Sequence, residues 1–570
     1  MLAFFLLTLG VACGAPAGKC CDTKDACGSA TSVCKDASTF CAASQANCEG
    51  KCAMTWCPDA PTPPPAPSPA IPTTIDSTRV LHVVSPSFLS FTVDACNVRA
   101  QPPFAGRGFN VSEPSFRALA AAMAPAYLRF GGTSADNLTY DMGDDNGKPR
   151  PGGIPAGTLL AADWDALADF AAASNWSLVV GLNALAGAGP AGTEPWDPAN
   201  ARTLLAHVKA KGQDVVGWEL GNEPGLSNKG LPHPRDPAQL ARDIGALRTE
   251  LVREFGSVGG GTRASPWLLG PDTTKGKLDY ASQVLRALSA APGTAPVLDA
   301  VTWHHYYLAG AGSATQPADF SSAKYLNTFA QYAQGYVALW RNASANASAV
   351  QRPSLWLGET GGAGGATATA KQVTGTVRGL FWYADKLGTA AASGHSVVCR
   401  QEWSELVKTN GPKAGGGLAF VAPDFWLALL WKRLVGSQVL QVLPAAAQTG
   451  NLRVYAHRAT AAATQQLLQQ QRQQRHAPRR APAALIVINL SNETSPLQLS
   501  IDGAAANASA ADVYSLSAPS GADVTARTVA LNGQELSVAA GGALPALAPL
   551  HRPAGTPLTV APASVTFFVL

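Results

Sequence analysis

Two glutamates stand at the ends of apolar segments that have the length of buried strands. Glu223 ends VVGWELGNE (215–223) directly after an asparagine, and Glu359 stands near the end of SLWLGET (354–360). Glycoside hydrolysis requires such a pair of carboxyl groups, because one donates a proton to the leaving oxygen and the other attacks the anomeric carbon. Each glutamate alone could form an ion pair at the rim of a fold. Their joint positions favour catalysis, with Glu223 as acid/base and Glu359 as nucleophile.

These glutamates belong to a repeating pattern of apolar segments between residues 86 and 435. Each segment has the length of a buried parallel strand, and most are followed by an amphipathic or alanine-rich helix. Eight such repeats predict a closed (β/α)8 barrel, an α/β fold whose functional residues collect at the carboxyl ends of the strands. An open doubly wound sheet is the alternative, but no GxGxxG motif follows the first strand. The segments are FLSFTVDA (88–95), AYLRFGG (126–132), SLVVGLNA (177–184), VVGWELGNE (215–223), WLLGPDT (267–273), LDAVTWHHYY (298–307), SLWLGET (354–360) and HSVVCRQ (395–401).

A barrel would place further polar residues beside the two glutamates. Glu223 and Glu359 end the fourth and seventh strands, which lie on opposite sides of an eight-stranded barrel, so the side chains can face each other across its mouth. His304 and His305 are expected to shape the cleft, since no third ligand motif suggests a metal ion. We therefore expect neither a metal nor an organic cofactor. The other polar residues at strand ends are Asp94, Arg129, Asn183, Asn222, Asp272 and Tyr306.

Three segments are similar to the signature sequences of one enzyme family. WELGNEP (218–224), VTWHHYY (301–307) and LWLGET (355–360) resemble those of heparanases and related β-glucuronidases, glycoside hydrolase family 79. FLSFTVDA, YLRFGGT, GLNAL and LLGPD agree in order and spacing, and the resemblance covers residues 77–455. It implies a retaining β-glucuronidase, endo or exo, that acts on uronate-containing glycans by double displacement.

The resemblance also implies roles for individual residues. Glu223 resembles the acid/base and Glu359 the nucleophile of the family. Asn222 resembles the residue that binds the sugar 2-hydroxyl, Tyr306 the tyrosine that steadies the nucleophile, and Asp94 a ligand of a sugar hydroxyl.

An acidic substrate implies further contacts. Lys275 and Lys277 follow the fifth strand, where the family has basic residues, although exposed lysines are often only solvated. Gly364 and Gly365 resemble backbone donors to a uronate carboxylate. After the eighth strand, however, residues 402–420 replace the family's Gly-Asn-Tyr segment. Two alternatives therefore stay open: a retaining β-glycosidase of another sugar specificity, and a non-catalytic glycan-binding protein.

The first 74 residues predict three segments outside this resemblance. Residues 1–15 form an apolar run ending in small residues, which is typical of a secretory signal peptide. Residues 16–57 contain eight of the 11 cysteines, the pattern of a small disulfide-stabilised module. This module is expected either to bind carbohydrate or to serve only as a cap. Residues 58–74 form a Pro-rich linker.

The rest of the chain divides into two predicted domains. The catalytic barrel spans residues 75–436, and its first part, 75–85, is expected to pair with the domain that follows. Residues 437–570 alternate apolar runs with Asn, Gly and Ser turns, which predicts a β-sandwich. Within it, residues 464–482 are a Gln/Arg-rich insertion that we expect to be disordered.

Composition and charge bound the class of protein. Apolar residues make up 46% and charged residues 14%, and the net charge is +4. These values exclude a disordered chain and argue against a nucleic-acid partner. No segment after residue 15 is long and apolar enough for an integral membrane span. We expect a secreted protein of the extracellular space or cell wall, with lysosome, vacuole or membrane surface as alternatives. Its expected partner is a polysaccharide or proteoglycan glycan, and the sequence leaves the oligomeric state open.

Two cysteines outside the module fall on predicted barrel strands. Cys96 and Cys399 lie on the first and eighth predicted strands, which are neighbours in a closed barrel. The pair therefore predicts either a disulfide or two unbridged, buried thiols.

Overall fold

The computed structural model divides the chain into two compact units, Met1–Pro67 and Ser68–Leu570. In the first unit, β1 (Gly18–Cys21) pairs antiparallel with β2 (Cys34–Lys35) and β3 (Thr55–Pro58). The predicted signal peptide, cysteine pairing and most of the Pro-rich linker lie outside what the structure describes. The described residues are 18–21, 34–35, 55–58, 72–98, 109–143, 157–226, 234–290, 298–309, 315–345, 352–364, 368–410, 417–473 and 482–570.

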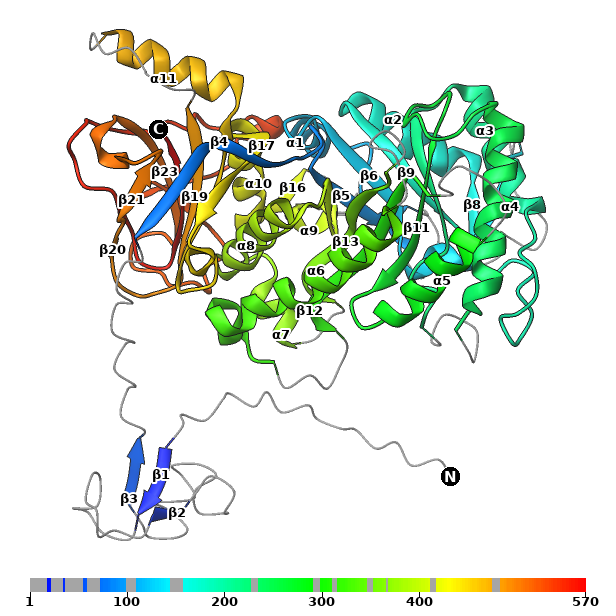
Figure 1. The fold of residues 1–570 in the computed structure, drawn as a ribbon, viewed down its shortest axis with the longest axis horizontal. Coiled ribbons are helices and arrows are strands. Elements are labelled where there is room, and N and C mark those ends of the chain that lie inside the picture. Colours follow the sequence, from blue (N-terminus) through cyan, green and yellow to red (C-terminus); the bar gives the residue numbers. More distant parts are fainter. Residues whose placement is uncertain are drawn as a thin grey trace. The chain divides into compact units, whose positions relative to one another are not determined.

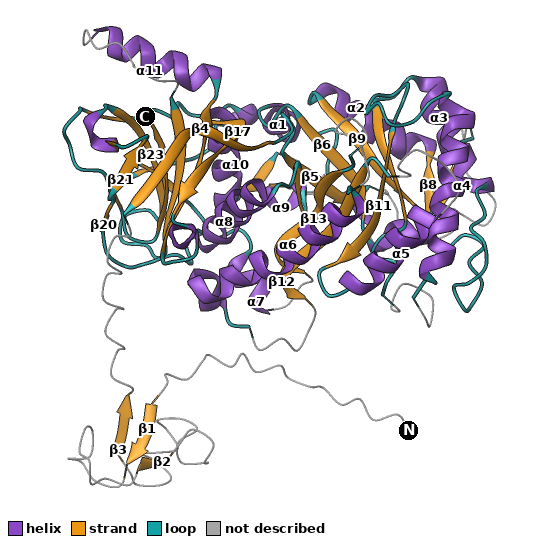
Figure 2. Ribbon diagram, viewed as in Figure 1, coloured by secondary structure: helices purple, strands orange, loops and turns teal. Residues whose placement is uncertain are grey.

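Eight parallel strands close into a barrel in the second unit (Figures 1 and 2). Each strand pairs with the next one along the chain, and the last pairs with the first. This order confirms the predicted (β/α)8 barrel and excludes the open doubly wound sheet. The strands are β5 (Leu89–Asp94), β6 (Ala126–Gly131), β9 (Trp176–Leu182), β10 (Val215–Leu220), β11 (Trp267–Thr274), β12 (Ala300–Ala309), β13 (Ser354–Gly364) and β14 (Val397–Arg400).

Helices follow the strands and cover the barrel, and α4 (Pro237–Phe255) shows why they form. Asp236 caps its amino end by accepting a hydrogen bond from the Gln239 N–H, and Gly256 ends it with φ 86°. Its apolar residues recur at helical spacing and are buried: Leu240, Ile244, Leu247 and Leu251. The other principal helices are α1 (Pro114–Ala121), α2 (Ala161–Ala173), α3 (Ala199–Lys211), α5 (Leu278–Ala290), α6 (Ala323–Ala343), α8 (Arg378–Ser393) and α10 (Pro423–Leu434).

The barrel interior changes from apolar to charged along its strands. On β6, Leu128 and Phe130 belong to the core shared with the helices, whereas Tyr127 packs with the interior cluster. Arg129 has the same parity as Tyr127, so it points into the barrel two residues closer to the mouth. The interior cluster below it consists of Val179, Val216, Leu269, Ala300, Trp356, Val397 and Cys399. An apolar floor therefore supports a polar mouth.

A sheet of eleven strands forms the predicted C-terminal β domain. It includes β4 (Thr73–Val83), which precedes the barrel in the chain and pairs antiparallel with β17 (Val435–Leu443). A two-stranded sheet of β20 (Ser495–Pro496) and β27 (Thr559–Val560) lies beside it, and β27 packs on β19 (Ala483–Asn489) and β28 (Ser564–Val569). Helix α8 packs against β18, β19 and β28. The central strands are β18 (Leu452–Ala459), β19 (Ala483–Asn489), β28 (Ser564–Val569) and β23 (Ala511–Ser517).

The predicted disorder over 464–482 is wrong for its first part, because α11 (Ala461–Gln473) is helical. Leu467 is fully buried, and the Ala463 N–H donates to the hydroxyl of Thr460 at the start of the helix. The low-complexity composition was misleading, since Gln, Leu, Arg and Ala all have high helix propensity. Leu467 and Ala463 are both buried and anchor the helix against α10 and the C-terminal sheet.

Cys96 and Cys399 are both free thiols, so the structure favours the unbridged alternative, although only Cys399 is buried and Cys96 is half-buried. The reason is the register of the two strands. Cys399 lies opposite Ser90, whereas Cys96 comes six residues later in the chain, beyond the end of β5. The four residues from Ser90 to the end of β5 at Asp94 already span roughly 13 Å, and a disulfide needs Cα atoms within about 7 Å.

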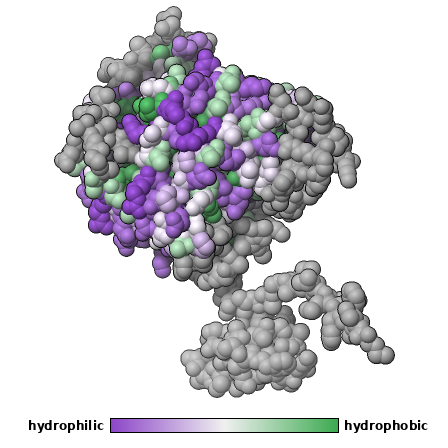
Figure 3. Space-filling model, turned by 90° about the vertical axis from the view of Figure 1, so that its right-hand side faces the viewer, coloured by the Kyte–Doolittle hydropathy of each residue, from purple (hydrophilic) through white to green (hydrophobic). Residues whose placement is uncertain are grey.

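The outer surface on the side of α3 and α4 is mainly hydrophilic, with apolar residues scattered among polar ones (Figure 3). Single exposed apolar residues are normal on soluble domains. No helix of the described residues is both long and apolar enough to cross a membrane.

Candidate active site

Arg129 organises a charged cluster in the barrel mouth. Its guanidinium donates to Glu219 (Nε, 2.7 Å), to Asp272 (Nη2, 2.5 Å) and to Glu359 Oε2 (Nη1, 3.1 Å). Nη2 also donates to Asn222 Oδ1 at 3.2 Å. Burial lowers the pKa of Arg129, but the three carboxylates outweigh burial and raise it well above the ordinary range. A permanent cation therefore fixes four side chains that come from β10, the turn after it, β11 and β13.

Glu359 is held at both oxygens. Oε2 accepts from Arg129, and Oε1 accepts from the hydroxyl of Tyr306 at 2.7 Å. Parallel pairing of β12 with β13 places Tyr306 opposite Gly361, so the phenol reaches back to the carboxylate. Burial, followed by Glu359 itself, raises the pKa of Tyr306 well above its ordinary value, which keeps the phenol protonated as a donor. Glu359 thus has the fixed orientation that a nucleophile needs.

Glu223 lies just beyond β10 with a left-handed backbone, φ 50°. Its N–H donates to the Asp272 carbonyl at 2.9 Å, which fixes this turn. Its Oε1 lies 3.2 Å from His304 Nδ1, and His304 Nε2 lies 2.6 Å from Asp272 Oδ1. The side chain is 15% exposed, compared with 9% for Glu359. Both carboxyl groups are therefore sheltered and reachable from the mouth.

His304 is a cation that links the carboxyl groups of Glu223 and Asp272. Burial lowers its pKa, but Asp272 and then Glu359 outweigh burial and raise it to about 10. Both ring nitrogens then carry protons and donate, one toward Asp272 and one toward Glu223. Predicted only to shape the cleft, His304 is part of the hydrogen-bonded network itself.

The spacing of the two glutamates identifies the mechanism that the site can support. One carboxylate oxygen of Glu223, one of Glu359 and a ring nitrogen of His304 all lie within 4.8 Å of one another. Retaining glycosidases hold their carboxyl groups about 5–5.5 Å apart, whereas inverting ones need roughly 6.5–9.5 Å. By distance alone the trio could also hold a metal ion, but His304 has both nitrogens committed to carboxylates. The geometry therefore fits acid–nucleophile catalysis better than metal binding.

Asp94 ends β5 beside the mouth and is half-buried. It accepts from the hydroxyl of Ser134 and from the Cys96 N–H at 3.2 Å. Its own N–H donates to Glu402 Oε2 at 3.2 Å, and Glu402 also accepts from Asn97. The divergent segment after β14 therefore begins by supporting Asp94, and its role as a ligand of a sugar hydroxyl stays a prediction.

The structure does not place Lys275 as a free cation for an anionic substrate. Its ammonium donates to the backbone carbonyls of Tyr306 and Tyr307, and burial lowers its pKa. The carbonyl oxygens near the end of β12 take the place of a substrate carboxylate as partners of Lys275. The position of Lys275 in the sequence could not reveal these partners. Lys277 lies farther along the same loop, where it packs near Gly225 in the turn after Glu223.

The two predicted glycines and His305 have different outcomes. Gly364 is the last residue of β13, whereas Gly365 lies outside the described residues. His305 is fully buried, away from the cleft, and packs against Tyr307 and Phe329. Alternation along β12 explains this, since neighbours on a strand point to opposite faces.

Glu219 is a site residue that the sequence analysis left unnamed. It lies on β10 two residues before the turn into the mouth, is fully buried and binds Arg129. Burial raises its pKa to about 7, and Arg129 opposes this. A lone charged residue inside an apolar strand was the available signal, because such a residue must have a buried partner.

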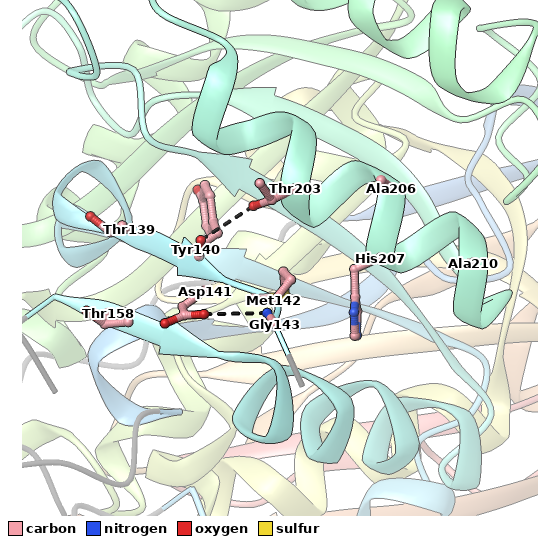
Figure 4. Close-up of a pocket in the computed structure, with 10 residues that line it drawn as sticks. All are labelled: Thr139, Tyr140, Asp141, Met142, Gly143, Thr158, Thr203, Ala206, His207 and Ala210. Atoms are coloured by element: carbon pink, nitrogen blue, oxygen red, sulfur yellow. Dashed lines mark hydrogen bonds between the residues drawn. The ribbon is translucent and has the colours of Figure 1, made fainter. Parts of the chain in front are cut away.

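A cavity lies away from this network, between β7 (Thr139–Asp141), β8 (Thr158–Leu160) and α3 (Figure 4). Tyr140, Met142 and His207 line it, together with small and polar residues. None of the predicted catalytic residues reaches it.

Comparisons with known proteins agree with the geometry of the mouth. The model of the glycosyl hydrolase family 79 N-terminal domain matches residues 107–388, a span that contains both glutamates. Heparanase from Gallus gallus is 32% identical over 532 residues, 86% of this chain and 93% of that protein. The chain belongs to glycoside hydrolase family 79. Baicalin-beta-D-glucuronidase from Scutellaria baicalensis is 27% identical over 476 residues, 78% of this family 79 chain and 80% of that protein.

Solved structures share the fold of this family 79 hydrolase. A 4-O-alpha-L-rhamnosyl-beta-D-glucuronidase from Fusarium oxysporum has a TM-score of 0.57 at 13% identity and covers 87% of this chain and 100% of its own. An alpha-L-arabinofuranosidase from Thermotoga maritima has a TM-score of 0.60 at 11% identity, covering 87% and 99%. Both likenesses concern the fold alone. Family membership makes the chain a glycoside hydrolase, which removes the non-catalytic alternative.

The charge on His304 predicts a pH-dependent stability. Its pKa is about 10 in the folded chain, against an ordinary 6.5. The imidazolium therefore stabilises the fold fully below pH 6.5, and this contribution is lost as the pH rises toward 10. We expect the stability difference between wild type and His304→Asn to shrink over that window by on the order of 3–5 kcal/mol. Urea unfolding at several pH values measures it, and a difference independent of pH would contradict a charged His304.

Proposed function

We propose that this family 79 chain is a secreted, retaining β-glucuronidase that cleaves uronate-containing glycans. The observation that carries the proposal is the short distance between Glu223 and Glu359, each held by its own partners. The names of two relatives, heparanase and baicalin-beta-D-glucuronidase, support a glucuronic acid substrate. The apolar segment 1–15 supports secretion, and the cysteine-rich segment 16–57 supports an accessory module for insoluble glycans.

The mechanism assigns each residue of the mouth a step. Glu359 attacks the anomeric carbon while Glu223 donates its proton to the leaving oxygen, so that the glycosidic bond breaks and a glycosyl-enzyme ester forms. Glu223, now ionised, then removes a proton from water, and the hydroxide displaces Glu359 from the sugar. Asn222 binds the 2-hydroxyl, and its Oδ1 contact with Arg129 fixes the amide so that the N–H groups point away from the guanidinium.

A second specificity has one observation in its favour. The segment that replaces the family's Gly-Asn-Tyr forms α9 (Trp403–Leu406) and places Glu405 on it, 3.4 Å from Arg400. Burial and Glu359 chiefly raise the pKa of Tyr306, and Glu405 adds the weakest contribution, while Arg400 offsets part of the Glu405 charge. A carboxylate there weakens the binding of an anionic sugar, which favours a modest uronate preference or a neutral substrate.

Matched substrates test the uronate specificity. We expect the kcat/KM of an aryl β-glucuronide to exceed that of the corresponding glucoside by roughly tenfold. A charge-assisted hydrogen bond to the uronate carboxylate contributes about 1.5–3 kcal/mol, and this chain lacks the tyrosine donor of the family, so the preference should be modest. The methyl ester of the glucuronide is the control, since it keeps the size and removes the charge. A glucoside that is cleaved as fast as the glucuronide would overturn the uronate assignment and leave the glycosidase assignment intact.

A further inference from the structure

Lys386 is a fully buried lysine on α8 that the two-carboxylate mechanism does not use. Its ammonium donates to Thr360 Oγ1 (2.8 Å), to the Gly361 carbonyl (3.0 Å) and to the His305 carbonyl (3.3 Å). An ammonium has three N–H donors, and three acceptors satisfy all of them. The rings of Tyr307, Trp382 and Phe329 surround the charge at 4.4, 4.9 and 5.4 Å.

The acceptors of Lys386 lie directly beside the nucleophile and its tyrosine partner. His305 precedes Tyr306 on β12, and Thr360 and Gly361 follow Glu359 on β13. The strands pair His305 with Thr360, and the Thr360 hydroxyl donates to the His305 carbonyl at 2.6 Å. One ammonium therefore connects both strands at the point from which Tyr306 and Glu359 project.

The strand pairing needs this support because it is irregular here. The register of β12 against β13 shifts between Trp303 and His304, and that of β13 against β14 shifts between Leu357 and Thr360. Such bulges interrupt the ladder of backbone hydrogen bonds and re-aim side chains near active sites. The Lys386 ammonium supplies hydrogen bonds to carbonyls on the mouth side of both irregularities.

We propose that Lys386 is a positioning residue that sets the direction of Glu359 toward the anomeric carbon by fixing the ends of β12 and β13. It acts through the backbone of these strands, since its three acceptors are two carbonyls and a threonine hydroxyl. Burial strongly disfavours its charged form and lowers its pKa. An apolar side chain of similar length would fill the same space without this cost, which argues that the hydrogen bonds themselves are needed.

The test compares Lys386→Met with a matched variant on the same helix. Asp385→Asn is the control, because Asp385 is equally buried but accepts from Arg453 and Tyr455 of the C-terminal sheet. This test rests on the proposed function. Its main readout is the rate at which a 2-fluoro-glucuronide labels Glu359 covalently, and the intact mass of the protein is measured to follow that labelling. A glucose-configured reagent runs in parallel, and Tm, kcat and KM are measured for each variant.

We expect Lys386→Met to label and turn over about 100-fold more slowly, with KM within about twofold, because a displacement near 1 Å has an effect of this size. Lys386→Arg should recover part of the rate, and Asp385→Asn should keep the wild-type rate despite a lower Tm. Thr360→Val, which removes the hydroxyl between Lys386 and His305, should slow labelling in the same sense even if the methionine variant does not fold.

Three results separate this proposal from the proposed function. Wild-type labelling rates in both Lys386→Met and Thr360→Val would overturn the positioning role. A loss of labelling in Asp385→Asn as large as that in Lys386→Met, at matched Tm, would also overturn it by showing only a stability effect. Labelling of the wild type by the glucose reagent alone would refute the uronate specificity, and the Lys386 comparison then proceeds with that reagent.

Discussion

Replacement of Glu359 by glutamine should reduce kcat by roughly a million-fold, or to below detection, on every substrate. The amide keeps the size of the side chain and an oxygen that can accept from Tyr306. It cannot form the glycosyl-enzyme ester, because its oxygen is a far weaker nucleophile than a carboxylate oxygen. Steady-state hydrolysis of an aryl glycoside with a very good leaving group measures the effect.

Glu250→Gln is the matched control for this change. Glu250 lies on α4, is largely buried and pairs with Arg202, away from the barrel mouth. We expect this control to lower Tm slightly and leave turnover unchanged. Thermal unfolding shows whether the Glu359→Gln variant is folded. A folded variant that turns over at the wild-type rate would contradict the double-displacement mechanism.

Replacement of Glu223 by glutamine should separate substrates by their leaving groups. Without a proton donor, glycosides with poor leaving groups should react about 10²–10⁴-fold more slowly. A very good leaving group needs no proton, so Glu359 should still be glycosylated. The ester should then accumulate, because the base that activates water is also gone, and intact mass spectrometry detects it.

The stereochemistry of the wild-type reaction checks the same geometry independently. Because the Glu223 and Glu359 carboxylates approach within 4.8 Å, the first-formed sugar should keep the β configuration. Proton NMR at early times distinguishes the anomers before they equilibrate. An inverted first product, or a Glu223→Gln variant that never accumulates an adduct, would rule out the assigned roles.

The sequence predicted the barrel because each buried strand is a continuous apolar run, and parallel strands buried on both faces have this composition. The same runs placed Glu223 and Glu359 at strand ends, which sufficed to bring them to one mouth. Their neighbours were harder to assign, since Arg129 and Asp272 stood at strand ends without a role. Only the closed barrel shows that they bind each other across its interior, from β6 and β11, which are not neighbours in the sheet.

Other features depended on contacts that no local pattern encodes. Lys275 and Lys386 both lie near the mouth. Packing between elements that are distant in the sequence decides whether their ammonium groups contact solvent or backbone carbonyls. For α11, a repetitive composition concealed a helix that Leu467 anchors in the core. The register that separates Cys96 from Cys399 follows from closure of the barrel, which strand order alone does not specify.

The pairing of β4 with β17 has a consequence for the order in which the chain folds during synthesis. His82 lies opposite Val439, so one partner is made before the whole barrel and the other after it. Until β17 emerges, β4 has no antiparallel neighbour, and a nascent barrel carries an unpaired strand. The C-terminal sheet thus joins the two flanks of the barrel only once both exist. Completion of the sheet should therefore be a late event, and chains that stop short of β17 should expose β4 as an aggregation-prone strand.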